Sequence, residues 1–238
     1  YNEDWYHDNI KETGGWSLEQ IDPANPCGEA GNWRASNDPK GGTPGSINSV
    51  NSPNADQSAP GIEKVSIAGE SIIRVFFSEP MDSLSLSNPA FYSVDNGLGN
   101  PLGISLYQPD YRSVNLIFGG IINDGTIYTL SMTAGFTDCA GNITTTVLTA
   151  RFAIPQNIEA NDVVINEVLS DPRATGTDFV EIYNRSEKVL DLKNLWLATR
   201  DATTLELASA KASAPDGRLV FPGDYLVRTA DAPVVQSE

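Results

Sequence analysis

Short runs in which apolar and polar residues alternate are the feature that most constrains the fold of this chain. In SIIRVFF and TIYTLSM, Val75 and Phe77, and Tyr128 and Leu130, fall on one face of an extended strand. The same alternation gives further one-sided apolar positions at Val114, Leu116, Phe118, Met132, Leu148, Ala150 and Phe152. Gly and Pro interrupt these runs, and Ser, Thr, Asn and Asp fill the gaps. The sequence therefore predicts an all-β protein.

The apolar faces predict two antiparallel sheets packed as a sandwich. Asn123, Asp124 and Gly125 form a turn signal just before Tyr128. We therefore expect the Tyr128 hydroxyl to hydrogen-bond back to the chain at a sheet corner, in a structural role.

Two polar stretches divide the chain into three parts. The segment at residues 52–58 lacks periodicity and holds Pro53, and the segment at 156–162 follows Pro155. We expect linkers there, which leaves residues 1–51, 59–155 and 163–238 as the folded parts.

Both outer parts read as incomplete. Residues 1–51 contain Trp5, Trp16 and Trp33 but are too turn-rich to build a core of their own. Residues 163–238 read as four strands with no closing element. We therefore expect the chain to be part of a larger protein, and we expect the two outer parts to need a partner.

Charge excludes several functions. The formal net charge is -16, from 15 Lys and Arg against 31 Asp and Glu. Such a surface cannot readily neutralise phosphates, which argues against nucleic acids and against anionic membranes. No apolar run reaches the roughly 20 residues that a membrane span needs. The acidity is typical of a protein that stays soluble outside the cell.

The sequence offers little catalytic chemistry. His7 is the single histidine, no serine lies in a nucleophile-elbow pattern, and two cysteines with one distant histidine make no zinc cluster. Glu167 and Glu181 are the carboxylates that a hydrolase could pair, but both lie in predicted strands, where a structural role is the simpler interpretation. We expect no enzyme.

Calcium is the one cofactor for which the sequence leaves room. Asp138 with Asn142, and Asp22 with Asn25 and Asp38, are the densest groups of oxygen ligands. The same residue types also build turns by hydrogen-bonding their own backbone. No EF-hand pattern is present. We expect no cofactor, with calcium as the alternative.

Cys27 and Cys139 are the two cysteines, and both lie in turn sequences, NPCG and DCAG. A buried thiol would normally occupy a strand, so these settings favour a disulfide between two modules. The alternative is a pair of free thiols. An unstrained bridge would contribute about 2–4 kcal/mol in an exported protein.

Three motifs in the middle part resemble a known family. FFSEPMD at residues 76–82, GTIYTLSM at 125–132 and TDCAGN at 137–142 occur in the order and spacing typical of the bacterial Ig-like domain first described in surface-layer proteins. The resemblance implies a spacer and presentation fold without catalysis.

The outer parts resemble two halves of a bacterial lamin-tail domain, itself a small Ig-like β-sandwich. Residues 163–197 and 218–228 are similar to its start. Residues 15–49 are similar to its end, with Gln20 where arginine is common. The resemblance implies a second sandwich assembled from the N- and C-terminal segments, either within one chain or between two copies.

These observations predict a non-catalytic fragment of an exported bacterial multidomain protein, outside the cell or at its surface, acting as spacer and presentation modules. Its expected partners are neighbouring modules, a swapped copy of itself or a cell-surface polymer. The alternative is a carbohydrate- or cell-surface-ligand-binding accessory module of a secreted hydrolase, with calcium as its optional cofactor. In that case Tyr6, Tyr107 and Tyr111 would stack on sugar rings.

Overall fold

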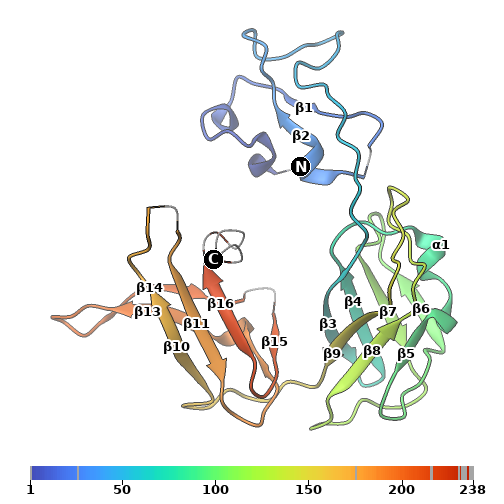
Figure 1. The fold of residues 1–238 in the computed structure, drawn as a ribbon, viewed down its shortest axis with the longest axis vertical. Helices are drawn as coiled ribbons and strands as arrows, with labels where there is room; N and C mark the ends of the chain where they lie inside the picture. The colour runs from blue at the N-terminus through green and yellow to red at the C-terminus, as the bar shows by residue number, and fades with distance from the viewer. Residues whose placement is uncertain are drawn as a thin grey trace.

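Three bodies follow one another along the chain: an N-terminal segment, a central domain and a C-terminal domain (Figure 1). The computed structural model describes residues 2–25, 27–174, 176–214, 217–229, 231 and 235. Its regular structure is almost entirely β, which confirms the all-β prediction. Within the described residues, no helix has the length and apolar character of a membrane span.

The central domain consists of two antiparallel sheets. The first has the order β3-β4-β7-β6, and the second has the order β5-β8-β9. The strands are β3 (Ile62–Gly69), β4 (Ile72–Phe77), β5 (Tyr92–Val94), β6 (Gly103–Leu106), β7 (Ser113–Ile117), β8 (Tyr128–Met132) and β9 (Leu148–Phe152). The sheets pack face to face, as the alternation predicts.

The core of this domain is apolar and closed. The predicted inward residues Val75, Phe77 and Leu130 are at most 1% exposed. Tyr128 stacks on Phe152 with ring centroids 5.3 Å apart. Its hydroxyl accepts a hydrogen bond of 3.0 Å from the backbone N–H of Asn123, which confirms the predicted corner.

A short helix, α1 (Ser83–Leu86), follows β4 in the chain. Asp82 caps it, because the carboxylate accepts hydrogen bonds from the backbone N–H groups of Leu84 and Ser85. Leu86 is fully buried, so this turn closes one end of the sandwich.

The C-terminal domain is smaller and more open. Its main sheet has the order β10-β11-β16 and two strand pairs, β12-β15 and β13-β14, lie beside it. The strands are β10 (Val163–Leu169), β11 (Phe179–Asn184), β12 (Leu190–Asp191), β13 (Trp196–Arg200), β14 (Leu207–Ala212), β15 (Leu219–Val220) and β16 (Tyr225–Thr229). Ile182, Leu190, Leu192 and Val220 form a small buried core.

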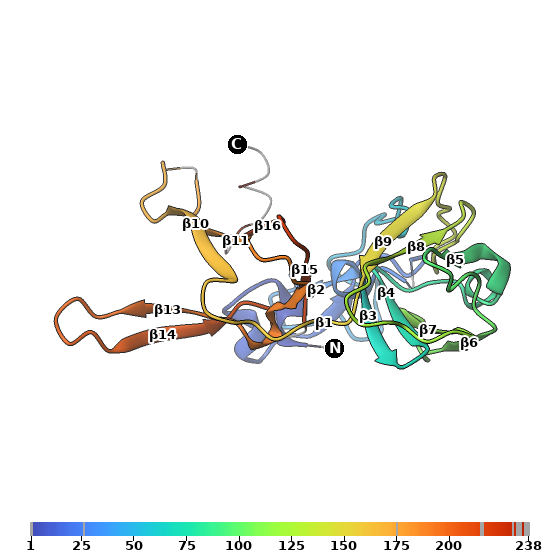
Figure 2. The same ribbon diagram turned by 90° about the horizontal axis from the view of Figure 1, so that it is seen from below.

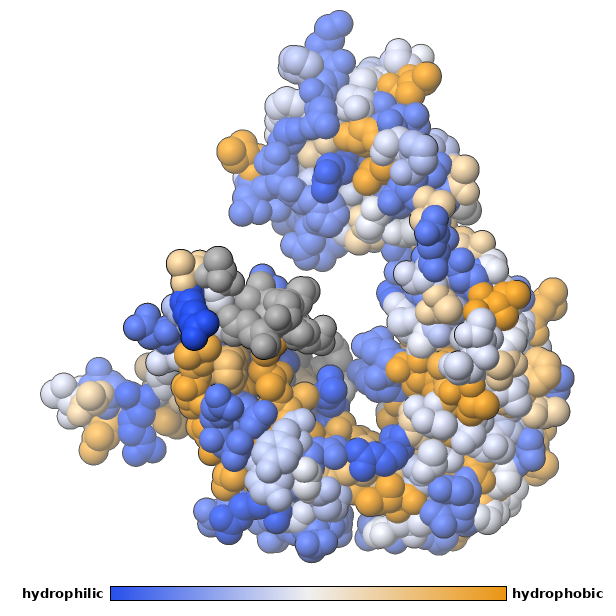
Figure 3. Space-filling model, viewed as in Figure 1, coloured by the Kyte–Doolittle hydropathy of each residue, from blue (hydrophilic) through white to orange (hydrophobic). Residues whose placement is uncertain are grey.

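Part of the apolar surface of this domain is uncovered. Ile165 and Val168 on β10 are 61% and 54% exposed. The β13-β14 hairpin projects away from the sheet, with Trp196 and Leu207 largely exposed (Figures 2 and 3). A two-stranded ribbon gains little stability by itself, so this domain exposes surface that a packed sandwich would bury.

The N-terminal segment contains little regular structure. Its elements are η1 (Glu3–Tyr6), η2 (Lys11–Thr13), β1 (Leu18–Gln20), η3 (Glu29–Asn32) and β2 (Trp33–Ala35), and β1 pairs with β2. Trp5, Trp16 and Trp33 are half-buried. Among the described residues of this segment, the buried positions are instead Glu19, Asn25, Asn32, Ala35 and Ser36. The segment is therefore organised around polar groups.

Glu19 is the centre of that polar interior. Its Oε1 accepts a hydrogen bond of 2.7 Å from the Thr43 hydroxyl. Its Oε2 accepts from the Ser49 hydroxyl at 2.6 Å and from the Ser49 backbone N–H at 2.7 Å. Burial would raise the pKa of Glu19, but these donors and Ser36 outweigh it and lower the pKa to about 2.

The two outer parts do not form one sandwich within this chain. In Figures 1 and 3 the described residues of the N-terminal segment and of the C-terminal domain lie apart, and each is attached to the central domain. Of the two versions of the expected association, the one within a single chain is therefore not present, and the one between copies stays a prediction.

Candidate functional sites at the two joints

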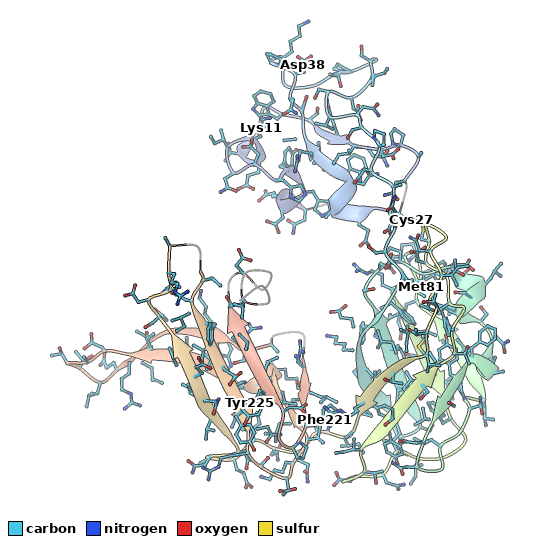
Figure 4. All side chains as sticks on the ribbon, in the orientation of Figure 1. Lys11, Cys27, Asp38, Met81, Phe221 and Tyr225 are labelled. Atoms are coloured by element: carbon cyan, nitrogen blue, oxygen red, sulfur yellow. A yellow bond between two sulfur atoms is a disulfide. The ribbon has the colours of Figure 1, made fainter. Side chains whose placement is uncertain are left out.

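The first joint, between residues 1–58 and the central domain, contains a covalent link. Cys27 and Cys139 form a disulfide with Cα atoms 5.8 Å apart (Figure 4). Cys139 lies in the TDCAGN turn, and its backbone N–H donates to the Pro80 carbonyl at 2.9 Å. The bridge thus joins the N-terminal segment to a turn that is itself fixed to the central sandwich.

An ion pair crosses the same joint. The Arg112 guanidinium lies 3.0 Å from the Glu29 carboxylate. It also donates a hydrogen bond to the Ser78 carbonyl, beside the end of β4. Both ion-pair partners are about one-third exposed. The pair therefore contributes more to orientation than to stability.

Asn54 fixes the predicted linker to the N-terminal segment. Its backbone N–H donates to the Asp22 carboxylate at 2.9 Å, and its carbonyl accepts from the Asn25 side chain at 2.7 Å. Its own side chain donates to the Asn32 amide oxygen at 3.0 Å. This part of the predicted linker is therefore held in place.

Three carboxylates meet where the linker reaches the central domain. Asp56, Glu79 and Asp138 each place an oxygen within 4.8 Å of the others. They come from the linker, from the bend that follows β4 and from the TDCAGN turn. Burial raises the pKa of Glu79 to about 7, and the carboxyl groups of Asp56 and Asp138 add to the effect. A shared proton and a divalent cation are both compatible with such a group.

The residues named for calcium are used mainly in turns. The side chain of Asp138 accepts hydrogen bonds of 2.8 Å from the backbone and side-chain amides of Asn142. Asp22 accepts from Ala24 and Asn54. Figure 4 places Asp38 at the end of the N-terminal segment far from Cys27, so the predicted group of Asp22, Asn25 and Asp38 does not assemble. Calcium binding stays a prediction.

Asp56 and Glu79 are not predicted as a site from the sequence. Glu79 lies inside the FFSEPMD motif, but its partner Asp56 is in the linker, and Asp138 is far along the chain. No local pattern links three such positions, because tertiary contacts alone bring them together.

The second joint, between the central and C-terminal domains, combines charge with apolar packing. The Arg151 side chain donates to both carboxylate oxygens of Asp224 at 3.0 Å, and it stacks 4.0 Å from the Phe221 ring centroid. Leu219 packs against the central core. The backbone N–H of Gln156 donates to the Val189 carbonyl at 2.8 Å. Gln156, the first residue of the second predicted linker, is therefore hydrogen-bonded to the C-terminal domain.

The catalytic candidates show no catalytic arrangement. His7 is exposed, and its Nε2 lies 3.1 Å from the Ala30 carbonyl. Glu167 and Glu181 are direct cross-strand neighbours on β10 and β11. Glu181 accepts a hydrogen bond of 2.6 Å from the Asn166 side chain. The two carboxylates thus lie side by side on an open sheet, and their structural role stays a prediction.

The three tyrosines named for sugar stacking each make contacts within the chain. The Arg74 guanidinium lies 4.0 Å from the Tyr107 ring centroid and donates a hydrogen bond to its hydroxyl. Tyr111 packs against the central core. Tyr6 is half-buried, and its hydroxyl lies 3.4 Å from the Trp16 carbonyl.

Comparison with known families agrees with the division of the fold. Residues 49–153 match the Bacterial Ig-like domain, and residues 156–235 match the Lamin Tail Domain. Residues 1–48 lie outside both matched ranges, so their assignment to a second lamin-tail copy stays a prediction. No curated protein matches the chain.

Among solved structures, the S-layer protein rSbsC(31-844) is 13% identical, with a TM-score of 0.37, over 72% of this chain and 32% of that one. The N-terminal part of the bacterial S-layer protein SbsC is 14% identical, with a TM-score of 0.35, over 70% of this chain and 45% of that one. This chain thus spans about a third of the longer structure. On the two family matches, the chain carries a bacterial Ig-like domain followed by a lamin tail domain.

Proposed function

We propose that the chain is a non-catalytic spacer and presentation segment of an exported bacterial protein. Its units are the Ig-like domain at residues 59–155 and lamin-tail segments at 1–51 and 163–238, separated at 52–58 and 156–162. The observation that carries the proposal is that contacts across both joints restrain the three bodies.

A spacer holds its ends at a fixed separation, and this requires joints that resist bending. Domains in one chain move relative to one another unless their interface is substantial. Here the first joint has the Cys27–Cys139 bridge and the second has Arg151 held between Asp224 and Phe221. The contacts thus oppose the flexibility that two polar linkers would otherwise give.

An oxidising location supports the same proposal. Disulfides form and persist outside the cell or in the bacterial periplasm, and they are rare in the cytosol. The first joint relies on such a bond. We therefore place the chain at the cell surface or outside the cell.

The partner we propose is another lamin-tail segment, from a neighbouring module or a second copy. The C-terminal sheet exposes Ile165 and Val168, and the N-terminal segment keeps Trp5, Trp16 and Trp33 half-buried. Burying such surface is favourable. Sedimentation should show self-association that strengthens with concentration, and Val168→Glu should weaken it. A chain that remains monomeric at every concentration would contradict this partner.

Small-angle scattering tests the spacer itself. The oxidised chain should give one compact distance distribution. Arg151→Gln should broaden the distribution, because it removes both hydrogen bonds from the guanidinium to the Asp224 carboxylate. Arg200→Gln, in the exposed β13-β14 hairpin, is the matched control and should leave it unchanged. A broad distribution for the unaltered chain would contradict a rigid spacer.

A further inference from the structure

The connection from β7 to β8 contains an Asp-Gly pair, Asp124 and Gly125, in an exposed turn (Figure 1). The chain is anchored on both sides of this turn. Before it, the backbone N–H of Ile122 donates to the Glu70 carbonyl at 2.8 Å. After it, the buried Tyr128 begins β8. The exposed pair therefore lies between two fixed points of the sandwich.

Within the turn, the side chain of Asp124 lies against the backbone of the next residue. Its Oδ1 atom accepts a hydrogen bond of 2.9 Å from the Gly125 backbone N–H. The carboxyl group is thus already turned toward the nitrogen of the following residue. Gly125 has no Cβ to shield that nitrogen, and its φ of +70° is one that glycine adopts without strain. Groups that are held close together react faster than groups that must first meet.

Asn96 and Gly97 form the corresponding amide pair, and they differ in this contact. The Asn96 side-chain amide donates to the Ile127 carbonyl at 2.9 Å. This hydrogen bond holds the side chain on a neighbouring segment of the chain, and Asn96 must break it before its side chain can turn to the Gly97 nitrogen. Conformers ready for attack at Asn96 should therefore be about 2- to 10-fold rarer than they would be without the bond.

We propose that Asp124 is a site of spontaneous covalent modification, at which aspartate converts to isoaspartate. The Gly125 nitrogen forms a bond to the Asp124 Cγ atom, and the amide hydrogen leaves with the carboxyl hydroxyl as water. Water then opens the resulting five-membered imide. Cleavage at the α-carbonyl carbon leaves the main chain running through Cγ, whereas cleavage at Cγ restores aspartate. Water is released once and consumed once, so the composition of the chain is unchanged.

The modification lengthens the main chain next to the sheet corner. Asn123, which precedes the site, donates its backbone N–H to the Tyr128 hydroxyl at 3.0 Å. Tyr128 stacks on Phe152 of β9, the strand that leads to the second joint. An added backbone atom displaces the Asn123 N–H and weakens this corner. The proposal goes beyond the spacer role, because it gives the Ig-like domain a chemical change that accumulates with age.

Peptide mapping by mass spectrometry, after prolonged incubation of the full chain at neutral pH, tests the modification. Electron-transfer fragmentation identifies isoaspartate at Asp124, and the same digest shows deamidation at Asn96 as a gain in mass. The other Asp-Gly pair, at residues 216–217, lies in a separate tryptic peptide. The ratio of Asp124 to Asn96 conversion should be about 2- to 10-fold higher in the folded chain than in urea. An equal or lower ratio, or no isoaspartate at Asp124, would overturn the proposal.

Variants separate the modification from its consequence. Asp124→Glu keeps the charge but would have to close a six-membered ring, so it should stay unmodified over the same incubation. Asp110→Glu, at another exposed position, is the matched control and should leave isoaspartate formation at Asp124 unchanged. Hydrogen exchange of the Asn123 amide should accelerate as the unaltered chain ages, but not as Asp124→Glu ages. Equal acceleration in both proteins would contradict the proposed effect on the corner.

Discussion

The central domain and the N-terminal segment bury opposite kinds of side chain. The centre of the first is Leu130, Tyr128 and Phe152, all at most 1% exposed. The centre of the second is the Glu19 carboxylate, 4% exposed and held by Thr43 and Ser49. The first gains its free energy from apolar burial, and the second depends on hydrogen bonds and on its attachment to the first.

This difference implies different sensitivities. Apolar burial responds weakly to pH and not at all to reducing agents. A buried carboxylate responds to pH, and a disulfide responds to reducing agents. The N-terminal segment should therefore unfold under conditions that leave the central domain intact.

Truncation of the central core should have the largest effect. Leu130→Ala removes a fully buried side chain from β8 and should lower the free energy of unfolding of the central domain by about 2–5 kcal/mol. Chemical denaturation, with hydrogen exchange of the β8 amides, measures the change. Ile121→Ala, at a position that is 64% exposed, should change little. A loss below about 1 kcal/mol for Leu130→Ala would mean that the core is not closed.

Removal of the disulfide should affect the other region. Replacing Cys27 and Cys139 by serine should lower the stability of the N-terminal segment by about 2–4 kcal/mol. Exchange of the β1 and β2 amides should accelerate, while that of the β4 and β7 amides should stay unchanged. Equal acceleration in both regions would show that the central domain also depends on the bridge.

Neutralising the buried carboxylate should have a smaller effect on the same segment. Glu19→Gln keeps the size of the side chain but leaves donors without a charged acceptor, which should cost about 1–3 kcal/mol. Glu3→Gln, at an exposed position, is the matched control. Exchange of the β1 amides measures both variants. Equal acceleration of exchange in Glu19→Gln and Glu3→Gln would show that Glu19 does not stabilise the segment more than an exposed carboxylate does.

Protonation of Glu19 at low pH should destabilise the N-terminal segment as Glu19→Gln does. The pKa of Glu19 is lowered from 4.5 to about 2, so its stabilising contribution is complete above pH 4.5 and disappears as the pH falls through 2. The stability of Glu19→Gln should change less over this range. Parallel pH profiles for the two proteins would contradict the assignment.

The smallest expected effect comes from Glu79 at the first joint. Its contribution to stability should decrease as the pH rises, whereas that of Glu19 should increase. The pKa of Glu79 is raised from 4.5 to about 7, so the folded state holds a proton that the unfolded state releases between these values. Its contribution is complete below pH 4.5 and is lost as the pH rises through 7. The stability of the unaltered chain should therefore fall relative to that of Glu79→Gln between pH 5 and pH 8. A constant difference would contradict the raised pKa.

The sequence predicts the central domain well because its information is local. Alternation over a few residues is enough to place Val75, Phe77 and Leu130 inside, and Tyr128 next to its turn. The motif resemblance agrees with the family match over residues 49–153.

The polar interior could not be predicted in the same way. The partners of Glu19 are 24 and 30 residues away in the chain, at Thr43 and Ser49, and no periodicity connects them. β14 was also missed, because LASAKA is poor in β-branched and aromatic residues and becomes a strand by pairing with β13. The cluster of Asp56, Glu79 and Asp138 at the first joint could not be predicted either, because it forms only when the linker packs against the central domain.

The central claim is that the joints hold the three bodies in one arrangement. Electron paramagnetic resonance distances between spin labels on non-natural amino acids at Lys40 and Glu187, both exposed, test it most directly. A single narrow distance distribution is expected for the oxidised chain, and a broad one after the disulfide is reduced. A broad distribution before reduction would contradict the account, because the N-terminal segment and the C-terminal domain would then move freely about the Ig-like domain.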